Sequence, residues 1–284
     1  MEDSHISDLS VGNNGKLQVF GVFDGHGGKE VAQFVKNHFT EELLQNSAYK
    51  SGNLKKALAE NFLRMDQMVV TNTGKIELKI ISQKSKEEDN IISQKEKNNK
   101  QMDILKTFLG QGKDDEDVAM MTGCTANVCV VDEQNKKIFF ANAGDSRSVL
   151  CKNGIAFPMS IDHKPDLDIE KNRIYKADGW VSDGRVKGNL NLSRSLGDLE
   201  YKQNKKLSAE DQMITAYPDV VVESLTSDIN FIVLACDGIW DCMTNQEVCD
   251  FITERLKKDS KQKLSKIIEE LMDKIVAPDI YTGI

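Results

Sequence analysis

The stretch LQVFGVFDGHGG, residues 17–28, predicts the local fold near the start of the chain and contains a candidate functional carboxylate. Its first seven residues are mostly apolar, with branched and aromatic side chains, which is typical of a buried strand. The strand stops at Asp24, because three of the next four residues are glycines and favour a loop. Beyond the loop, apolar residues recur at three- and four-residue spacing and predict a helix over residues 31–39. Asp24 is therefore expected at the end of a buried strand.

A second stretch, FIVLACDGIWD at residues 231–241, repeats this design. Asp237 follows an apolar strand and precedes a glycine, as Asp24 does. An ionised carboxylate at such a place is costly unless a cation or a hydrogen-bond donor meets it. The glycine lets the backbone carbonyl approach the same partner. Since oxygen ligands favour Mg²⁺ or Mn²⁺ over zinc, the pair predicts a site for a hard cation.

A turn is the simpler explanation for either motif alone, because Asp-Gly is common in turns. Two further acidic clusters make this explanation the weaker one for both motifs together. Glu2 and Asp3 stand at the start of the sequence, and Asp145 lies in the sequence GDSR. We therefore interpret the four clusters as parts of one cation site.

The order of the expected elements predicts an α+β fold. Short apolar runs joined by polar turns, with a hairpin signal at Asn153-Gly154, indicate antiparallel strands. Helical patterns lie on both sides of the strands, and one of them opens with a capping box at residues 244–247. We expect strands at 125–131, 137–143, 146–151, 220–223 and 231–236, and helices from about 54, over 167–177, from 244 and over 264–275.

Residues 74–120 interrupt this pattern. Lys, Glu, Gln, Asn and Asp dominate, and the string IISQK occurs at residues 80–84 and again at 91–95. Such a composition offers little apolar surface to offset the entropy of ordering. We expect a low-complexity charged insertion that is partly disordered, with a charged docking arm as the functional alternative.

Composition excludes several classes of protein. A net charge of −8 argues against non-specific nucleic-acid binding, which needs a basic surface. Six cysteines without a CxxC pair argue against a zinc site or a disulfide framework and indicate a reducing compartment. The longest apolar stretch, residues 231–236, is too short to span a bilayer, and the start of the chain lacks a signal-peptide pattern. We expect a monomeric cytoplasmic or nuclear protein.

Taken in order, seven motifs resemble those of the type 2C family of metal-dependent serine/threonine protein phosphatases. They span nearly the whole chain outside the insertion. They are MEDSH at residues 1–5, VFDGHGG at 22–28, GCTA at 123–126, GDSR at 144–147, DHKP at 162–165, LSRSLGD at 192–198 and ACDGIWD at 235–241. The resemblance implies a single catalytic domain over residues 1–284, built as a four-layer α-β-β-α sandwich of two antiparallel sheets flanked by helices.

The resemblance also implies the roles of individual residues. Asp24 matches a carboxylate that bridges two cations, Mg²⁺ or Mn²⁺, and Gly25 matches a residue whose carbonyl binds one of them. Asp237 matches a terminal ligand. Three carboxylates match residues that hold or orient metal-bound waters: Glu2, Asp3 and Asp241. Asp145 matches a residue that is linked to a weaker third cation.

The chemistry implied for phosphoprotein substrates is attack on phosphorus by a hydroxide that bridges the cations, without a phosphoenzyme. His26 resembles the general acid that protonates the leaving seryl oxygen. The other three histidines, His5, His38 and His163, are expected to be structural. The segments 173–188 and 191–198 match regions near the active site that we expect to influence substrate choice.

Two pieces of the family pattern are missing from the sequence. An arginine usually precedes the first motif, and an Asp-Asn motif with a further metal-ligating Asp usually follows near the point where the sequence ends at Ile284. We therefore expect a piece of a longer protein, incomplete at both ends. Two other functions stay open: a catalytically weak phosphatase-like module that binds partners, and a phosphatase of small phosphate esters.

Overall fold

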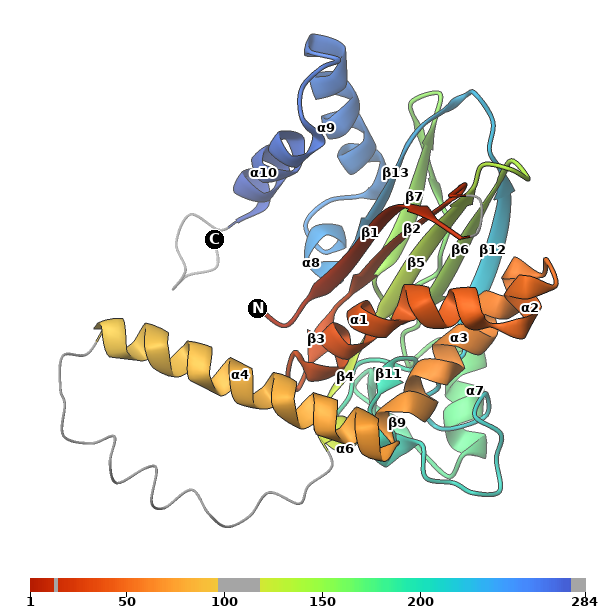
Figure 1. Cartoon of the computed structure of the whole chain (residues 1–284), viewed down its shortest axis with the longest axis vertical. Helices are drawn as coiled ribbons and strands as arrows, with labels where there is room; N and C mark the ends of the chain where they lie inside the picture. The colour runs from red at the N-terminus through yellow and green to blue at the C-terminus, as the bar shows by residue number, and fades with distance from the viewer. Residues whose placement is uncertain (13–14, 97–117, 277–284) are drawn as a thin grey trace.

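Five antiparallel strands form the larger sheet (Figure 1). The computed structural model describes residues 1–12, 15–96 and 118–276, and within 85–96 it describes the backbone alone. The strands lie in the order β1-β2-β5-β6-β12. Their bounds are Ser4–Val11 for β1, Leu17–Phe23 for β2, Ala126–Asp132 for β5, Lys137–Ala143 for β6 and Asp219–Ser224 for β12.

A second antiparallel sheet packs against the first and has the strand order β13-β7-β8. The hairpin between β7 and β8 turns at Asn153 and Gly154, which have φ values of +52° and +78°, as the sequence predicts. The bounds of the strands are Arg147–Lys152 for β7, Ile155–Pro158 for β8 and Ile229–Ala235 for β13.

Two small groups of strands complete the β structure. One has the order β11-β4-β3 and brings three distant loops together beside the end of β2. The other pairs β10 with β9. The bounds are Gly25–His26 for β3, Gly123–Cys124 for β4, Val181–Ser182 for β9, Arg185–Val186 for β10 and Leu196–Gly197 for β11.

Different helices contact the two sheets. Helices α1 and α3 pack on the larger sheet, whereas α8 and α9 contact the smaller one and α10 packs on α9 (Figure 1). The longer helices are α1 Glu30–Gln45, α3 Leu54–Val69, α4 Asn72–Glu96, α7 Asp168–Lys176, α9 Asn245–Lys258 and α10 Leu264–Ile275. The short ones are α2 Ser47–Lys50, α6 Val118–Met121, α8 Asp237–Trp240 and the 3₁₀ helix Leu199–Tyr201.

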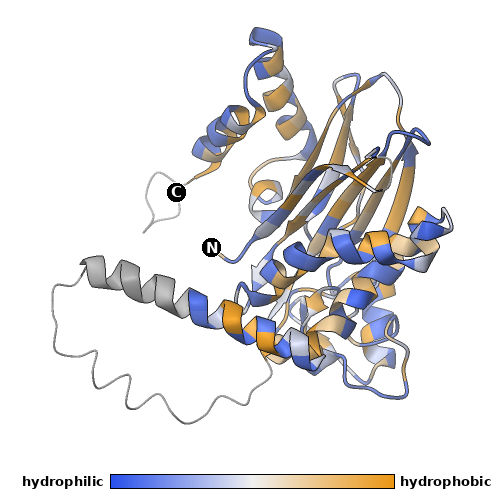
Figure 2. Cartoon of the chain, in the orientation of Figure 1, coloured by the Kyte–Doolittle hydropathy of each residue, from blue (hydrophilic) through white to orange (hydrophobic). Residues whose placement is uncertain are grey.

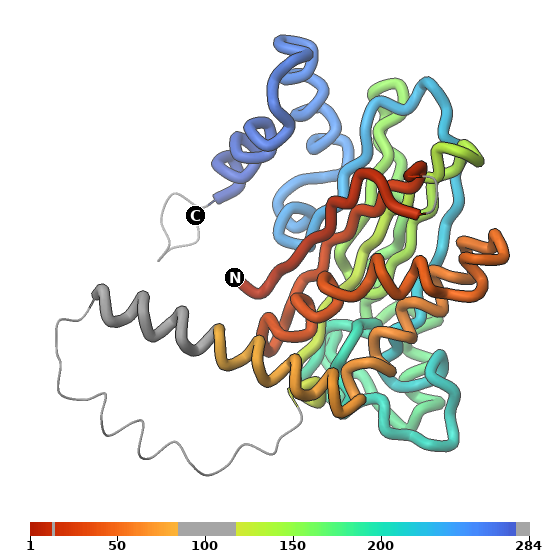
Figure 3. The backbone as a smooth tube through the Cα atoms, in the orientation of Figure 1, coloured from red at the N-terminus to blue at the C-terminus, as the bar shows by residue number. Residues whose placement is uncertain are grey.

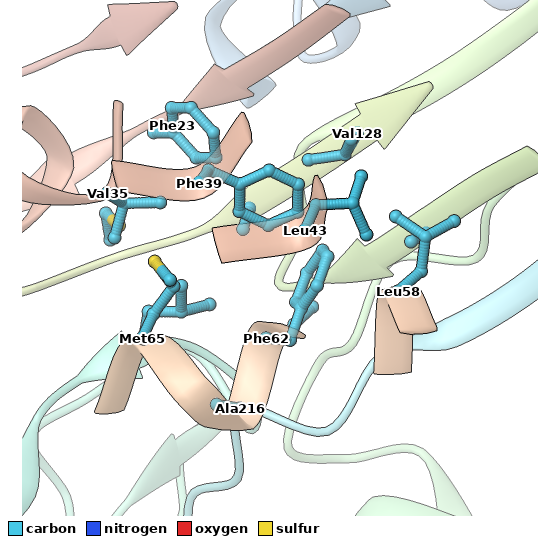
Figure 4. Close-up of a cluster of buried hydrophobic side chains, with 14 of the residues drawn as sticks. Phe23, Val35, Phe39, Leu43, Leu58, Phe62, Met65, Val128 and Ala216 are labelled. Atoms are coloured by element: carbon cyan, nitrogen blue, oxygen red, sulfur yellow. The ribbon is translucent and has the colours of Figure 1, made fainter. Parts of the chain in front are cut away.

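The largest hydrophobic cluster lies between α1, α3 and the larger sheet. Phe39 of α1 packs against Phe23 of β2 and Phe62 of α3, with ring centroids 6.1 and 5.4 Å apart (Figure 4). All three rings are fully buried. Apolar residues run along the strands, and polar residues gather on the outer faces of the helices (Figure 2). This core fixes the end of β2, where Asp24 lies.

The structure confirms the α+β class with antiparallel sheets and most of the expected elements, while the exact four-layer order stays a prediction. Strand β1 was not predicted, because its sequence SHISDLSV is mostly polar. It pairs with β2 from Ser4↔Phe23 onward. That pairing carries the first residues of the chain to the end of β2.

Helix α4 corrects the expected boundary of the insertion. The charged insertion was placed at residues 74–120, yet the start of α4 packs on α1, α3 and α6. Leu78 is fully buried in the main core, and Ile81 packs against that core. Leu78 and Ile81 therefore attach the start of α4 to the main core, although most residues of the helix are polar. Residues 97–117 lie outside the described residues, so their expected disorder stays a prediction.

Within the described part of the chain, none of the helices combines the length and the apolar character that a membrane crossing requires.

Candidate metal centre and active site

The ends of β2 and β13 meet at one edge of the two sheets. Asp24 follows β2, and Cys236 and Asp237 follow β13. The N-terminal segment lies beside them (Figure 3). One side-chain ligand atom each of Asp3, Asp24 and Cys236 lies within 4.8 Å of the other two. Residues from three separate parts of the chain therefore converge on one small volume.

Hydrogen bonds to Thr125 fix the backbone of Asp24. Its backbone N–H donates to the Thr125 hydroxyl at 3.2 Å, and the Thr125 N–H donates to the Asp24 carbonyl at 2.9 Å. The Thr125 hydroxyl also lies 2.7 Å from the hydroxyl of Ser146. The motifs GCTA and GDSR thus support the strand end that carries the carboxylate.

Gly25 is required by a close approach of the backbone. A Cβ at this position would lie 2.4 Å from the carbonyl oxygen of Glu2. The absence of a side chain lets the N-terminal segment lie against the loop after β2 and brings Asp3 to Asp24. The side chain of Glu2 is exposed, and that of Asp241 lies near Asp237 at the end of α8.

The carboxylates repel each other strongly. Burial, followed by the charges of Asp3 and Asp237, raises the pKa of Asp24 from 3.8 to about 7. Burial also raises the pKa of Asp237, and the charges of Asp145 and Asp241 raise it further. A divalent cation among these oxygens would relieve the repulsion. The donor set, which is mainly carboxylate, therefore fits Mg²⁺ or Mn²⁺.

Asp145, the candidate ligand of a third metal cation, is paired with a lysine side chain. Its carboxylate is 3% exposed and forms an ion pair with the ammonium of Lys164, from the motif DHKP. Burial opposes protonation of this lysine, but the hydrogen bond to Asp145 and its charge raise the pKa of Lys164. A cation at Asp145 would have to compete with Lys164.

His26 lies beside the carboxylates and is bound to a second acid. Its Nε2 is 2.7 Å from Oδ2 of Asp198, which also accepts a hydrogen bond from the Ser195 hydroxyl. Burial disfavours the charged imidazolium, yet the hydrogen bond and charge of Asp198, with the charge of Asp24, leave the pKa of His26 raised. A histidine that holds its proton in this way can serve as a general acid.

Sequence reasoning missed three residues at this site: Cys236, Lys164 and Asp198. Burial raises the pKa of Cys236 to about 12, so its thiol is neutral. Each of the three lies inside a motif that the sequence singled out, but no spacing indicated which neighbour it contacts.

Two other residues of the sequence motifs, Arg194 and His163, have structural partners. Arg194 is 6% exposed; its guanidinium binds both carboxylate oxygens of Glu170 and also Asp219. His163 accepts a hydrogen bond from the Gly144 N–H on Nδ1, and its Nε2 lies 3.1 Å from Asp219. Both side chains therefore stabilise the surrounding loops: His163 binds the backbone of Gly144 next to Asp145, and Arg194 links Glu170 to Asp219.

Carboxylates gathered at strand ends, with a histidine beside them, are typical of metal-dependent hydrolases. A family model described as Protein phosphatase 2C matches residues 1–79 and 71–281. The chain is 43% identical over 289 residues to Probable protein phosphatase 2C 21 of Arabidopsis thaliana, covering all of this chain and 79% of that protein. It is 42% identical over 285 residues to Protein phosphatase 2C 1 of Paramecium tetraurelia, covering all of this chain and 83% of that one.

Solved structures show the same fold. A phosphatase from Toxoplasma gondii superposes with a TM-score of 0.67 at 22% identity, over 96% of this chain and 83% of that one. Serine-threonine phosphatase 2C from the same organism gives a TM-score of 0.65 at 18% identity, over 96% and 88%. The chain belongs to the protein phosphatase 2C family, whose members are metal-dependent serine/threonine phosphatases.

Proposed function

We propose that the chain hydrolyses phosphoserine and phosphothreonine esters of proteins at the carboxylate cluster around Asp24 and Asp237, without a phosphoenzyme. The observation that carries the proposal is the convergence of Asp3 and Asp24 with the end of β13, within a chain of this family. Two divalent cations at Asp24, Gly25 and Asp237 would supply an activated water and neutralise charge on the phosphoryl oxygens. Glu2, Asp3 and Asp241 would hold water around them, and Asp145 would hold a weaker third cation.

His26 supplies the proton that the seryl or threonyl oxygen needs as it leaves. The raised pKa of His26 favours its imidazolium form, and its side chain is 27% exposed, so substrate can reach it. The free thiols are not needed as nucleophiles in this scheme. Cys236 in particular is a poor one, because a neutral thiol attacks slowly.

The test uses a phosphothreonine peptide with Mg²⁺ or Mn²⁺, and the same reaction in excess chelator. We expect turnover only with the cation, and full turnover in chelator would refute the proposal. A catalytically weak binding module would show tight peptide binding without phosphate release. Family membership does not favour that alternative.

His26→Ala tests the acid role separately. A general acid matters for a poor leaving group such as a serine alkoxide and little for nitrophenolate. We expect a loss on the order of 10²-fold for a phosphoserine peptide and a much smaller loss for nitrophenyl phosphate. Equal losses on both substrates would contradict the acid role.

A further inference from the structure

Asp198, at the end of the LSRSLGD motif, is buried beside the candidate acid and has no role in the scheme above. It is 3% exposed and adopts the left-handed conformation, with φ at +49°. Asp198 and His26 are 172 positions apart in the sequence, yet their side chains are 2.7 Å apart. A non-glycine residue in this strained conformation needs support from its surroundings.

The loop that carries Asp198 is anchored on several sides. The Asp198 N–H donates to the Thr122 carbonyl at 2.9 Å. Behind the loop, Asp66 of α3 accepts from the Gly197 N–H at 2.8 Å and from the Lys202 ammonium at 2.5 Å. The same ammonium donates to the Ser195 carbonyl at 2.7 Å. The position of the Asp198 carboxylate is therefore fixed independently of His26.

Strand β4 lies directly against the contact between His26 and Asp198. A Cβ on Gly123 would lie 2.3 Å from Oδ2 of Asp198 and 2.7 Å from Nε2 of His26. Only glycine leaves room for the two side chains to meet against this strand. Backbone pairing of Gly123 with His26 and with Gly197 holds both partners to β4. The fold thus builds a rigid contact between two otherwise separate loops.

His26 needs such a contact because it ends the two-residue strand β3, between Gly25 and the glycines at 27 and 28. An imidazole that rotates freely seldom has the geometry for proton transfer, and fixing it in advance lowers the entropic part of the barrier. The carboxylate binds Nε2, which leaves Nδ1 as the ring nitrogen free to meet substrate. We propose that Asp198 is a positioning residue for the general acid, binding Nε2 of His26 so that Nδ1 faces the leaving oxygen.

This inference rests on the acid role proposed above and names the ring nitrogen of His26 that donates the proton. The proton passes from Nδ1 to the oxygen of the breaking P–O ester bond. The ring is left neutral, with its remaining hydrogen on Nε2 and directed at Asp198. The Asp198 carboxylate accepts the hydrogen bond from Nε2 before and after this step, so it orients the ring and does not relay a proton.

A double-mutant cycle tests the coupling. Asp198→Asn keeps the shape of the side chain and removes its charge, and His26→Ala removes the ring. We expect Asp198→Asn to slow a phosphoserine peptide by roughly tenfold or more and nitrophenyl phosphate by much less. In the His26→Ala background, Asp198→Asn should have no further effect. Independent losses that multiply would overturn the proposal.

Glu77→Gln is the matched control. It removes the charge from a histidine–carboxylate contact of the same 2.7 Å length, between Glu77 and His38 on α1, outside the carboxylate cluster. We expect this variant to keep wild-type rates on both substrates. A loss equal to that of Asp198→Asn would show that the effect is general destabilisation and would overturn the proposal.

A second measurement needs no variant of Asp198. Nitrogen-15 NMR of the wild-type protein labelled at histidine reports which ring nitrogen of His26 carries hydrogen, with His26→Ala used to assign the signal. We expect hydrogen on Nε2 in the neutral ring, and a neutral ring protonated on Nδ1 alone would overturn the proposal. If His26→Ala leaves phosphoserine turnover unchanged while Nε2 carries hydrogen, the acid role fails and the Asp198 contact stands.

Discussion

In the absence of cation, Asp24→Asn should stabilise the protein although it destroys the site. The pKa of Asp24 is raised to about 7 from an ordinary value of 3.8, because of burial and the charges of Asp3 and Asp237. The folded state therefore holds this proton more tightly than the unfolded state. Between about pH 4 and pH 7 the unfolded chain has lost the proton while the folded chain retains it, so stability falls as pH rises.

The size of the effect follows from the shift. About three pKa units at about 1.4 kcal/mol each set a ceiling of roughly 4 kcal/mol above pH 7. The carboxyl is only partly buried, and solvent screening reduces the expected gain to about 2 kcal/mol. A neutral amide at position 24 removes this penalty.

Urea unfolding in chelator at pH 5 and pH 8 measures the change in the free energy of unfolding. We expect Asp24→Asn to be more stable than wild type at pH 8, with a smaller difference at pH 5. Asp145→Asn is the matched control, because Asp145 is paired with Lys164 and its replacement should destabilise the protein. With Mn²⁺ added, wild type should gain strongly in stability and Asp24→Asn should not. Loss of stability at pH 8 for Asp24→Asn in chelator would refute the reasoning.

Three further substitutions test other parts of the structure. Asp237→Asn should abolish phosphatase activity while the circular dichroism spectrum stays unchanged, and an unchanged rate would make Asp237 a turn residue. Gly25→Ala would push on the Glu2 carbonyl and should raise the Mn²⁺ concentration for half-maximal activity on the order of tenfold, whereas Gly238→Ala, whose Cβ meets nothing within 4 Å, should not. Leu78→Ala should cost about 2–5 kcal/mol of unfolding free energy, whereas an alanine at an exposed apolar site of α4 should cost little, and equal costs would contradict the anchoring of α4.

Much of the fold was predictable because its signals are local. The strand before Asp24 and the hairpin at Asn153-Gly154 depend on neighbouring residues alone. The capping box at Thr244 is of the same kind, and the structure has both of its reciprocal hydrogen bonds with Glu247. Strand β1 was missed because its alternation is weak and its place depends on pairing with β2.

The contacts that organise the candidate site depend on long-range packing. Nothing near His26 in the sequence indicates Asp198, and nothing near Asp145 singles out Lys164 as its partner. Leu78 shows the same limit, because isoleucines at 76, 80 and 81 lie beside it and only its packing on α1 and α3 decides that Leu78 is the fully buried one. The motifs predicted which residues matter, and the fold determines which of them touch.

Anomalous diffraction from crystals soaked in Mn²⁺ tests the central claim most directly, because it locates the cations without reference to activity. We expect manganese peaks at the end of β2, about 2.1 Å from the carboxylate oxygens of Asp24 and Asp237. Manganese elsewhere on the protein, with no peak beside Asp24, would contradict the account.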